Sequence, residues 1–221
     1  MSTDQTVEAT FCFVDIAGYT ALTESHGELA AADLIEEFSE LVRIAIATTG
    51  NVQDFIGDCA FIVFPEPVCA IAAVSDLYQR VADRRNFPVV RVGLHHGTAL
   101  FRKRRYFGST INLAARVAER ATGGQILVTA EVASVLAAAV VPDVEIEHLG
   151  PVRLKNVIRS VDLYEIILPM SPREYVIDPV CKMQVDKNRA AGHLHFEDEP
   201  YWFCSLSCIE SFAGNPSMYV N

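Results

Sequence analysis

Apolar residues recur along the chain with two different periods. Short apolar runs of strand-like spacing alternate with longer segments in which apolar residues return every three or four positions. The short runs predict strands at 9–16, 51–56, 59–64, 89–100, 125–129, 144–150 and 161–168. The longer segments predict helices at 28–48, 67–85, 109–121 and 130–139. This order of elements predicts an α+β fold in which helices cover one face of a sheet, as in ferredoxin-like folds.

A proline-rich segment interrupts the pattern after residue 168. The stretch PMSPREYVIDP (169–179) places three prolines in eleven residues, and proline removes a backbone donor and ends regular elements. We therefore expect a first domain over residues 1–168, a linker over 169–175 and a small module over 176–221.

Composition and charge narrow the class of protein. The 221 residues are 51% hydrophobic, which is enough for a substantial core, and the net charge of −10 argues against nucleic acid as a partner. The N-terminus lacks a signal pattern, and no apolar run approaches the roughly 20 residues that span a membrane. We expect a cytoplasmic protein without a membrane partner. The basic run RKRR (102–105) is either a solvated hairpin tip or a group beside a phosphate-bearing ligand.

Two aspartates stand where predicted strands end. Asp15 closes the first strand, and Asp58 follows Gly57 in the two-residue gap between strands 51–56 and 59–64, the spacing of a tight hairpin. If the two carboxylates meet, their hard oxygens suit Mg²⁺ or Mn²⁺. Alternatively, each aspartate simply completes a turn.

Two further segments suggest a nucleotide site. IAGYT (16–20) leads from a strand into a helix start, whose free N–H groups attract phosphate. Gly18, Tyr19 and Thr20 are therefore candidate nucleotide-binding residues. Asn112 and Arg116 are four residues apart and share a helix face, where Asn can orient a sugar and Arg can hold phosphoryl charge. Both can equally be ordinary surface residues.

Five segments in order and spacing resemble the catalytic domain of class III adenylate and guanylate cyclases. They are FVDIAGYT, FIGDCAFIVF, VGLHHGTAL, YFGSTINLAARVAERATGGQILVT and GPVRLKNV. The resemblance covers about Ala9 to Leu168 and implies a ferredoxin-like domain with an antiparallel sheet. It also implies formation of a cyclic 3′,5′-nucleotide and pyrophosphate from ATP or GTP. The alternative is a weak or inactive cyclase-like protein that binds nucleotide or senses metal.

The resemblance implies a metal site in which Asp15, Asp58 and the carbonyl of Ile16 hold two divalent ions, Mg²⁺ or Mn²⁺. In this family, such a site draws its remaining groups from a second chain of a head-to-tail homodimer.

The groups expected from the second protomer are Asn112, Arg116 and Lys155. By resemblance, Asn112 and Arg116 match the pair that orients the ribose and stabilises the transition state, and Lys155 matches the lysine that holds the triphosphate.

Two base-reading positions depart from the adenylate cyclase pattern. Asp54 stands where those enzymes have lysine, and Arg105 stands where they have aspartate or threonine. Asp54 can accept hydrogen bonds from guanine N1–H and N2–H while Arg105 donates to O6. The two residues can instead pair with each other and leave the base unread, or the domain can have lost turnover. The presence of every residue matched to the chemistry favours an enzyme.

The six cysteines fall into two groups. Three lie in apolar segments and are expected in the core, namely Cys12, Cys59 and Cys69. The other three are Cys181, Cys204 and Cys208. Because Cys204 and Cys208 are one helical turn apart, their thiolates can join Cys181 in a three-sulfur site for Zn²⁺ or Cu⁺.

The C-terminal segment resembles a YHS domain from about Val176 to Val220, in DPVC, YWFCSLSC and NPSMYV. Lys182 stands where glycine is usual, which puts the local turn in question. His193 or His195 is a candidate fourth metal ligand, or else an exposed residue. The module is too short to bury much core alone, so we expect it to bind metal or to pack on the first domain. It is expected to act as a regulatory or metal-sensing appendage.

Overall fold

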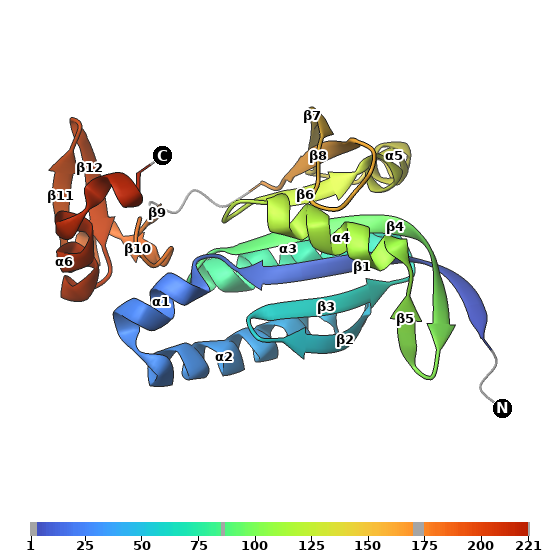
Figure 1. Ribbon diagram of the computed structural model, residues 1–221, viewed down its shortest axis with the longest axis horizontal. Helices are drawn as coiled ribbons and strands as arrows, with labels where there is room; N and C mark the ends of the chain where they lie inside the picture. Colours follow the sequence, from blue (N-terminus) through green and yellow to red (C-terminus); the bar gives the residue numbers. More distant parts are fainter. Residues whose placement is uncertain (1–3, 85–86, 170–174, 221) are drawn as a thin grey trace.

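A computed structural model describes residues 4–84, 87–169 and 175–220. An eight-stranded sheet runs through the first domain in the order β2-β3-β1-β4-β6-β8-β7, with β5 paired to β4 (Figure 1). The strands are β1 Gln5–Ile16, β2 Asn51–Ile56, β3 Cys59–Phe64, β4 Val90–Arg102, β5 Arg105–Phe107, β6 Ile126–Thr129, β7 Glu145–Val152 and β8 Val161–Ile167. Neighbouring strands are antiparallel except β4 and β6, which are parallel.

Helices cover both faces of this sheet. They are α1 Tyr19–His26, α2 Glu28–Ile46, α3 Pro67–Asp83, α4 Ser109–Arg120 and α5 Ala130–Ala139. The α+β class is confirmed, but the sheet is not wholly antiparallel and the helices are not confined to one face. The reason lies in β1, which is apolar on both sides. Cys12 and Val14 join the core beneath α2 and α3, whereas Phe11 and Phe13 join the core beneath α4.

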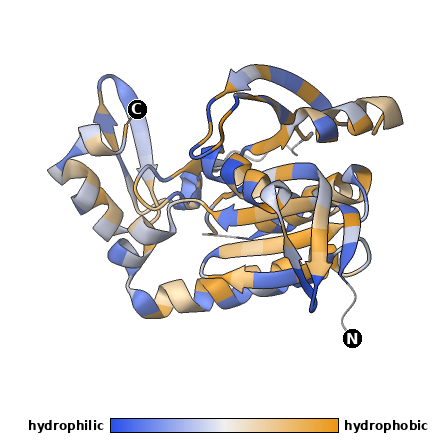
Figure 2. Ribbon diagram, turned by 45° about the vertical axis from the view of Figure 1, so that its right-hand side comes forward, coloured by the Kyte–Doolittle hydropathy of each residue, from blue (hydrophilic) through white to orange (hydrophobic). Residues whose placement is uncertain are grey.

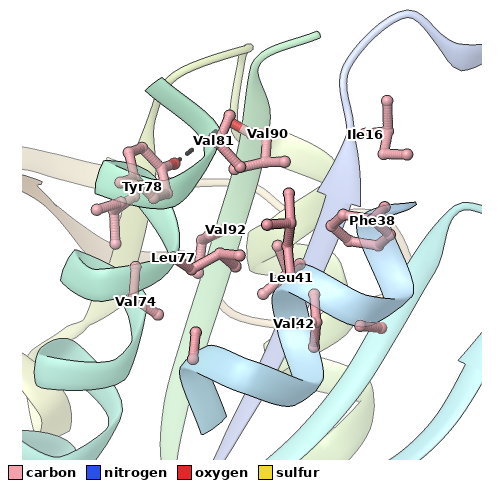
Figure 3. Close-up of a cluster of buried hydrophobic side chains, with 14 of the residues drawn as sticks. Ile16, Phe38, Leu41, Val42, Val74, Leu77, Tyr78, Val81, Val90 and Val92 are labelled. Carbon is pink, nitrogen blue, oxygen red and sulfur yellow. Dashed lines mark hydrogen bonds between the residues drawn. The ribbon is translucent and has the colours of Figure 1, made fainter. Parts of the chain in front are cut away.

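The larger core lies between the sheet and helices α2 and α3 (Figure 3). Phe38 and Leu77 are fully buried there, and burial of such a side chain contributes about 1.5–3 kcal/mol. Tyr78 is buried as well, and its hydroxyl donates to the carbonyls of Val90 at 3.3 Å and Gln125 at 3.1 Å. This tyrosine therefore ties α3 to the sheet without leaving a buried hydroxyl unpaired. Figure 2 shows hydrophobic colour concentrated in the central strands and alternating along the helices.

Helix α4 approaches β4 closely at Gly93. A Cβ at this position would lie 2.0 Å from the backbone nitrogen of Ala118 and 2.4 Å from its Cα. Both are backbone atoms of α4, so no side-chain rotation relieves the clash. Glycine at position 93 thus sets the distance between α4 and the sheet.

Replacing Gly93 by alanine is expected to lower the free energy of unfolding by about 1–3 kcal/mol, because α4 must move away from the sheet. Urea denaturation measures this change. The matched control is Gly214→Ala, where nothing lies within 4 Å of an added Cβ, and the expected change is within about 0.5 kcal/mol. Equal stability of Gly93→Ala and the unaltered protein would contradict the packing described for α4.

The C-terminal module consists of two small hairpins and one helix. Its elements are β9 Tyr175–Ile177, β10 Gln184–Asp186, β11 Gly192–Phe196, β12 Glu199–Phe203, α6 Leu206–Gly214 and the 3₁₀ turns Lys187–Arg189 and Pro216–Met218. Phe203 and Phe212 are buried at its centre, and their rings pack in a tilted arrangement with 5.1 Å between centroids.

The module docks on the first domain through backbone and side chains. The N–H of Val89 donates to the Lys182 carbonyl at 3.2 Å, and the N–H of Gln184 donates to the Phe87 carbonyl at 3.1 Å. Val180 and Cys181 belong to the same buried cluster as the main core. Figure 1 shows α1 lying against the module, beside α6. Of the two expectations for this short segment, packing on the first domain is thus observed.

Most predicted elements occur with the expected type, and boundaries differ by a few residues. β2 and β3 have the predicted limits, and RKRR forms the tip of the β4–β5 hairpin, with Arg102 opposite Arg105. Residues 170–174 of the expected linker lie outside the described residues. Among the helices of the described residues, none combines the length and the hydrophobicity that a transmembrane span requires.

Candidate active site and thiol cluster

Asp15 and Asp58 lie close together at one end of the sheet. Asp15 is opposite Cys59 in the β1–β3 register, and the N–H of Ile16 donates to the Asp58 carbonyl at 3.3 Å. Gly57 makes the tight hairpin turn with φ +63°, a conformation that glycine adopts at little cost. Burial raises the pKa of Asp15, hydrogen bonds from Arg91 oppose the increase, and the Asp58 carboxylate adds to it. Of the two alternatives that the sequence left open for these aspartates, a meeting of the carboxylates and two separate turn residues, the structure has the first.

Arg91 on β4 orients the Asp15 carboxylate. Its Nε donates to Asp15 Oδ2 at 2.7 Å, and its Nη2 donates to the same oxygen. Its Nη1 also donates to the carbonyl of Ala121, at 3.5 Å, just after α4 ends. Arg91 therefore connects the candidate metal ligand to the end of α4. Sequence reasoning missed this residue, because its role depends on the register that places Arg91 opposite Asp15.

The turn after β1 leads directly into α1. Gly18 is the N-cap of α1 with φ +72°, and the N–H of Ala17 donates to the Val89 carbonyl at 2.9 Å. Tyr19 and Thr20 lie in the first turn, where helix N–H groups have no partner within the helix. A Cβ at Gly18 would lie 2.7 Å from Cγ of Lys182. The candidate phosphate turn is thus in direct contact with the C-terminal module.

The residues expected to orient the ribose and to stabilise the transition state lie on α4, away from the Asp15–Asp58 pair. Asn112 is exposed, and Arg116 donates through Nη1 to both carboxylate oxygens of Glu119. Asn112 precedes Ala121 by nine residues, or about 13 Å at roughly 1.5 Å per helical residue. Since the end of α4 is the part that approaches Asp15, Asn112 is held well away from the carboxylate pair of its own chain.

Lys155 lies in the loop between β7 and β8. Its side chain is exposed, while the preceding Leu154 is buried and anchors the loop on a small apolar cluster. Asn156 has φ +61°, which turns the chain immediately after the lysine. The loop therefore presents Lys155 to solvent from a fixed base.

Asp54 and Arg105 are exposed on different strands. Asp54 follows a bulge in β2, and its Oδ1 accepts a hydrogen bond from the N–H of Phe55 at 3.0 Å. Arg105 begins β5. Both lie in the described part of the chain, where no ion pair joins them. The arrangement in which these two residues neutralise each other is therefore not the one observed.

Three thiols and one imidazole form a second cluster. The Sγ atoms of Cys181 and Cys204 are 3.3 Å apart, and those of Cys204 and Cys208 are 3.8 Å apart. Nε2 of His26, at the end of α1, lies 3.5 Å from Cys204 Sγ and 3.8 Å from Cys208 Sγ. All four candidate ligand atoms lie within 4.8 Å of one another. The grouping of the three cysteines was predicted, whereas His26 was not.

The two histidines considered as fourth ligands lie outside this cluster. His193 and His195 are exposed on β11, and their rings contact each other at 5.6 Å between centroids. His193 also packs on Trp202. Neither histidine reaches the thiols, because alternate residues of a strand point to the same side and both rings point to the solvent side of the hairpin.

Asp178 holds the thiol segments in place. It is fully buried, and its carboxylate accepts hydrogen bonds from the N–H groups of Val180 at 2.9 Å and Cys204 at 2.8 Å. Burial raises the pKa of Asp178, and these hydrogen bonds oppose the increase. Asp178 is the aspartate of the DPVC segment, and no local pattern in the sequence indicates its supporting role.

The thiols also interact electrostatically. Hydrogen bonds with Cys204 and Cys208 raise the pKa of Cys181, whereas hydrogen bonds from Cys181 and Cys204 lower the pKa of Cys208. Among the other cysteines, Cys12 is fully buried as expected, while Cys59 and Cys69 are only half-buried. Lys182 has φ +60°, so the turn that usually contains glycine forms here with lysine.

Two family models match the chain. The model for the adenylate and guanylate cyclase catalytic domain matches residues 1–167, and the YHS domain model matches residues 176–221. The chain therefore belongs to the class III adenylate and guanylate cyclase family and carries a C-terminal YHS domain.

Curated relatives agree with this assignment. An uncharacterized protein of Mycobacterium tuberculosis is 34% identical over 155 residues, covering 70% of this chain and 40% of the relative. The pH-sensitive adenylate cyclase of the same species is 31% identical over 160 residues, covering 72% of this chain and 40% of that protein. The chain thus spans about 40% of the length of these relatives.

Solved structures show the same fold. The adenylyl cyclase CyaB from P. aeruginosa superposes with a TM-score of 0.63 at 22% identity, covering 78% of this chain and 98% of that one. An adenylate/guanylate cyclase/hydrolase from Silicibacter pomeroyi gives a TM-score of 0.67 at 23% identity, covering 76% of this chain and all of that one, 100%. These matches establish the cyclase fold.

Proposed function

We propose that the protein is a nucleotidyl cyclase that converts ATP or GTP into a cyclic 3′,5′-nucleotide and pyrophosphate. The observation that carries this proposal is the Asp15–Asp58 pair beside the Gly18 turn, in a chain of the cyclase family. A metal–triphosphate site requires carboxylates to bind the metal ions and free backbone N–H groups to bind the phosphates. The aspartate pair supplies the first, and the start of α1 supplies the second.

The donor set fits hard divalent ions. Asp15 and Asp58 supply carboxylate oxygens, and the Ile16 carbonyl adjoins them, so these three residues would hold Mg²⁺ or Mn²⁺. When bound, two such ions lower the pKa of the ribose 3′-hydroxyl and neutralise the triphosphate. Arg91 would position the Asp15 carboxylate and limit its repulsion with Asp58.

Arg116 would stabilise the charge that grows on the phosphoryl group in the transition state, and Asn112 would orient the ribose. Arg116 must first leave Glu119. This exposed pair, three residues apart on one helix, contributes only about 0–1 kcal/mol, so substrate can displace Glu119 at small cost. Lys155 would hold the triphosphate from its exposed loop.

We propose that two copies share each site. Asn112 is distant from the carboxylates of its own chain, so a partner must supply that group. Apolar side chains near these residues are exposed: Leu100 and Phe107, which face each other across β4 and β5, are 37% and 48% exposed, and Ile56 is 62% exposed. A second copy that covers these side chains would gain apolar burial while completing both sites.

Asp54 and Arg105 are expected to set the base preference. A carboxylate only accepts hydrogen bonds, and guanine offers N1–H and N2–H where adenine has an acceptor at N1. Because Asp54 and Arg105 do not pair with each other, both remain available to a base. The hydrogen-bonding groups of Asp54 and Arg105 favour GTP, whereas the pH-sensitive relative from Mycobacterium tuberculosis is an adenylate cyclase. Both nucleotides therefore belong in the first assay.

The change Asp54→Lys is expected to lower the ratio of kcat/KM for GTP to that for ATP by at least about 10-fold, because lysine cannot accept from guanine. Initial rates with each nucleotide measure the ratio. Asp33→Lys, an exposed position on α2, makes the same charge change and should leave the ratio unaltered. An unchanged ratio in Asp54→Lys would remove this residue from base recognition.

The assay that tests the proposed function uses purified full-length protein with Mn²⁺ and either ATP or GTP. Chromatography follows cyclic nucleotide and pyrophosphate, which should appear in equal amounts. Absence of product from both nucleotides, with nucleotide bound and the oligomer intact, would favour the alternative function of a cyclase-like sensor.

A further inference from the structure

The thiol cluster joins the two domains at one point. Cys181 follows β9, Cys204 follows β12 and Cys208 lies in α6, so all three belong to the YHS module. His26 belongs to the cyclase domain and ends α1, 178 residues before Cys204. Cys181 and Cys208 are fully buried, and His26 and Cys204 are partly buried. The cluster therefore lies at the domain interface, with two of its four side chains fully buried.

Four of the six distances among the candidate ligand atoms can be compared with those around a tetrahedral zinc ion, and the other two, from Cys181 Sγ to Cys208 Sγ and to His26 Nε2, are at most 4.8 Å. Zn–S and Zn–N bonds of about 2.3 Å and 2.0–2.1 Å give tetrahedral edges of roughly 3.8 Å between sulfurs and roughly 3.5 Å between sulfur and nitrogen. The structure has 3.8 Å between Cys204 and Cys208, and 3.5 Å and 3.8 Å from His26 to these sulfurs. The 3.3 Å edge between Cys181 and Cys204 requires a shift of about half an ångström.

The ligand positions are held by groups outside the cluster. Asp178 fixes the backbone of Cys204, and the side chain of Ser205 accepts from the N–H of Cys208 at 3.2 Å. Such supporting hydrogen bonds orient metal ligands before the metal arrives. Three thiolates with one imidazole favour zinc over magnesium, and tetrahedral sites with four protein ligands are structural rather than catalytic.

We infer that Zn²⁺ bound by Cys181, Cys204, Cys208 and His26 fastens the YHS module to α1 and so fixes the turn that precedes this helix. His26 ends α1, and Gly18 at the opposite end packs under Lys182, the neighbour of Cys181. Backbone hydrogen bonds continue the connection, from Ala17 N–H to Val89 carbonyl and from Val89 N–H to Lys182 carbonyl. The metal thus restrains the turn at residues 16–18 from both ends of α1.

This site lies outside the proposed catalytic machinery and needs no nucleotide turnover, so its test is independent of the cyclase assay. Full-length protein is kept reduced with a phosphine, and Zn²⁺ affinity is measured by competition with a chromophoric chelator. One equivalent per chain is expected for the unaltered protein. His26→Ala should weaken binding by at least about 100-fold, since it removes a ligand rather than a supporting group.

Two kinds of variant control for folding. His26→Cys should retain one tight zinc and, with Co²⁺ as probe, show stronger sulfur-to-cobalt charge-transfer absorption than the unaltered protein, because a fourth thiolate replaces the imidazole. His193→Ala and His195→Ala remove histidines of the same module outside the cluster and should leave affinity unchanged. Equal zinc affinity of His26→Ala and the unaltered protein, or loss of binding in His193→Ala or His195→Ala, would overturn the assignment.

Hydrogen–deuterium exchange tests the restraint on the cyclase domain. Addition of Zn²⁺ should slow amide exchange in residues 16–26 of the unaltered protein, and His26→Ala at the same Zn²⁺ concentration should not show this protection. Unchanged exchange in residues 16–26 upon stoichiometric zinc binding would show that the metal does not act on the turn.

Discussion

Replacing Asp58 by alanine is expected to reduce cyclic-nucleotide formation by at least about 100-fold. Loss of groups that merely support metal ligands costs about 10–100-fold, and Asp58 is proposed as a ligand itself. The hairpin should survive the change, because Gly57 makes the turn and the contact with Ile16 uses the Asp58 backbone carbonyl. Rates are measured with saturating Mn²⁺ and the preferred nucleotide.

The matched control for this prediction is Asp33→Ala, an exposed aspartate on α2. It should retain the rate of the unaltered protein. A second measurement follows thermal unfolding of both variants. If Asp58→Ala folds normally and keeps more than about a tenth of the activity, then Asp58 does not hold the ions that the reaction requires.

Arg116→Ala is expected to lower kcat by about 100–1,000-fold, the usual effect of removing a group that meets charge in the transition state. KM should change much less, because the guanidinium acts on charge that the ground state has not yet developed. The change also breaks the exposed pair with Glu119, which affects stability by no more than about 1 kcal/mol.

Arg120→Ala provides the control on the same helix. Both arginines lie on α4, and Arg120 is exposed in its last turn, so the two substitutions remove the same side chain from the same element. Normal kcat is expected for Arg120→Ala. An equal loss in both variants would indicate damage to α4, and a rise in KM with unchanged kcat in Arg116→Ala would assign Arg116 to substrate binding alone.

The sequence was informative where local pattern decides structure. Two six-residue strand-like segments around Gly57 and Asp58 sufficed for a hairpin whose strands have the predicted limits. Strand-end placement made a meeting of Asp15 and Asp58 possible but left open that each only completes a turn. Local pattern could not predict which face of the sheet α4 covers. A strand that is apolar on both sides, as β1 is at Phe11 and Cys12, indicates two covered faces but not which helix covers each.

Residues missed by sequence reasoning act across large separations. Arg91 reaches Asp15 only through strand register, and His26 reaches Cys204 only because the module docks on α1. Neither contact leaves a periodic or local signal. His193 and His195, close to the cysteines in sequence, were the obvious candidates, and strand geometry turns them away. Proximity along the chain was a poor guide to a site built between two domains.

If two chains together form each catalytic site, two inactive variants should complement each other in a mixed dimer. Asp58→Ala and Arg116→Ala are each expected to be nearly inactive alone. If the chains exchange freely in a 1:1 mixture, half of the dimers combine one of each. Each mixed dimer has one intact site and one doubly altered site, so activity should recover to about one quarter of that of the unaltered protein. Recovery near one quarter would support the shared site. No recovery at any mixing ratio, with chain exchange demonstrated by labelled subunits, would contradict it.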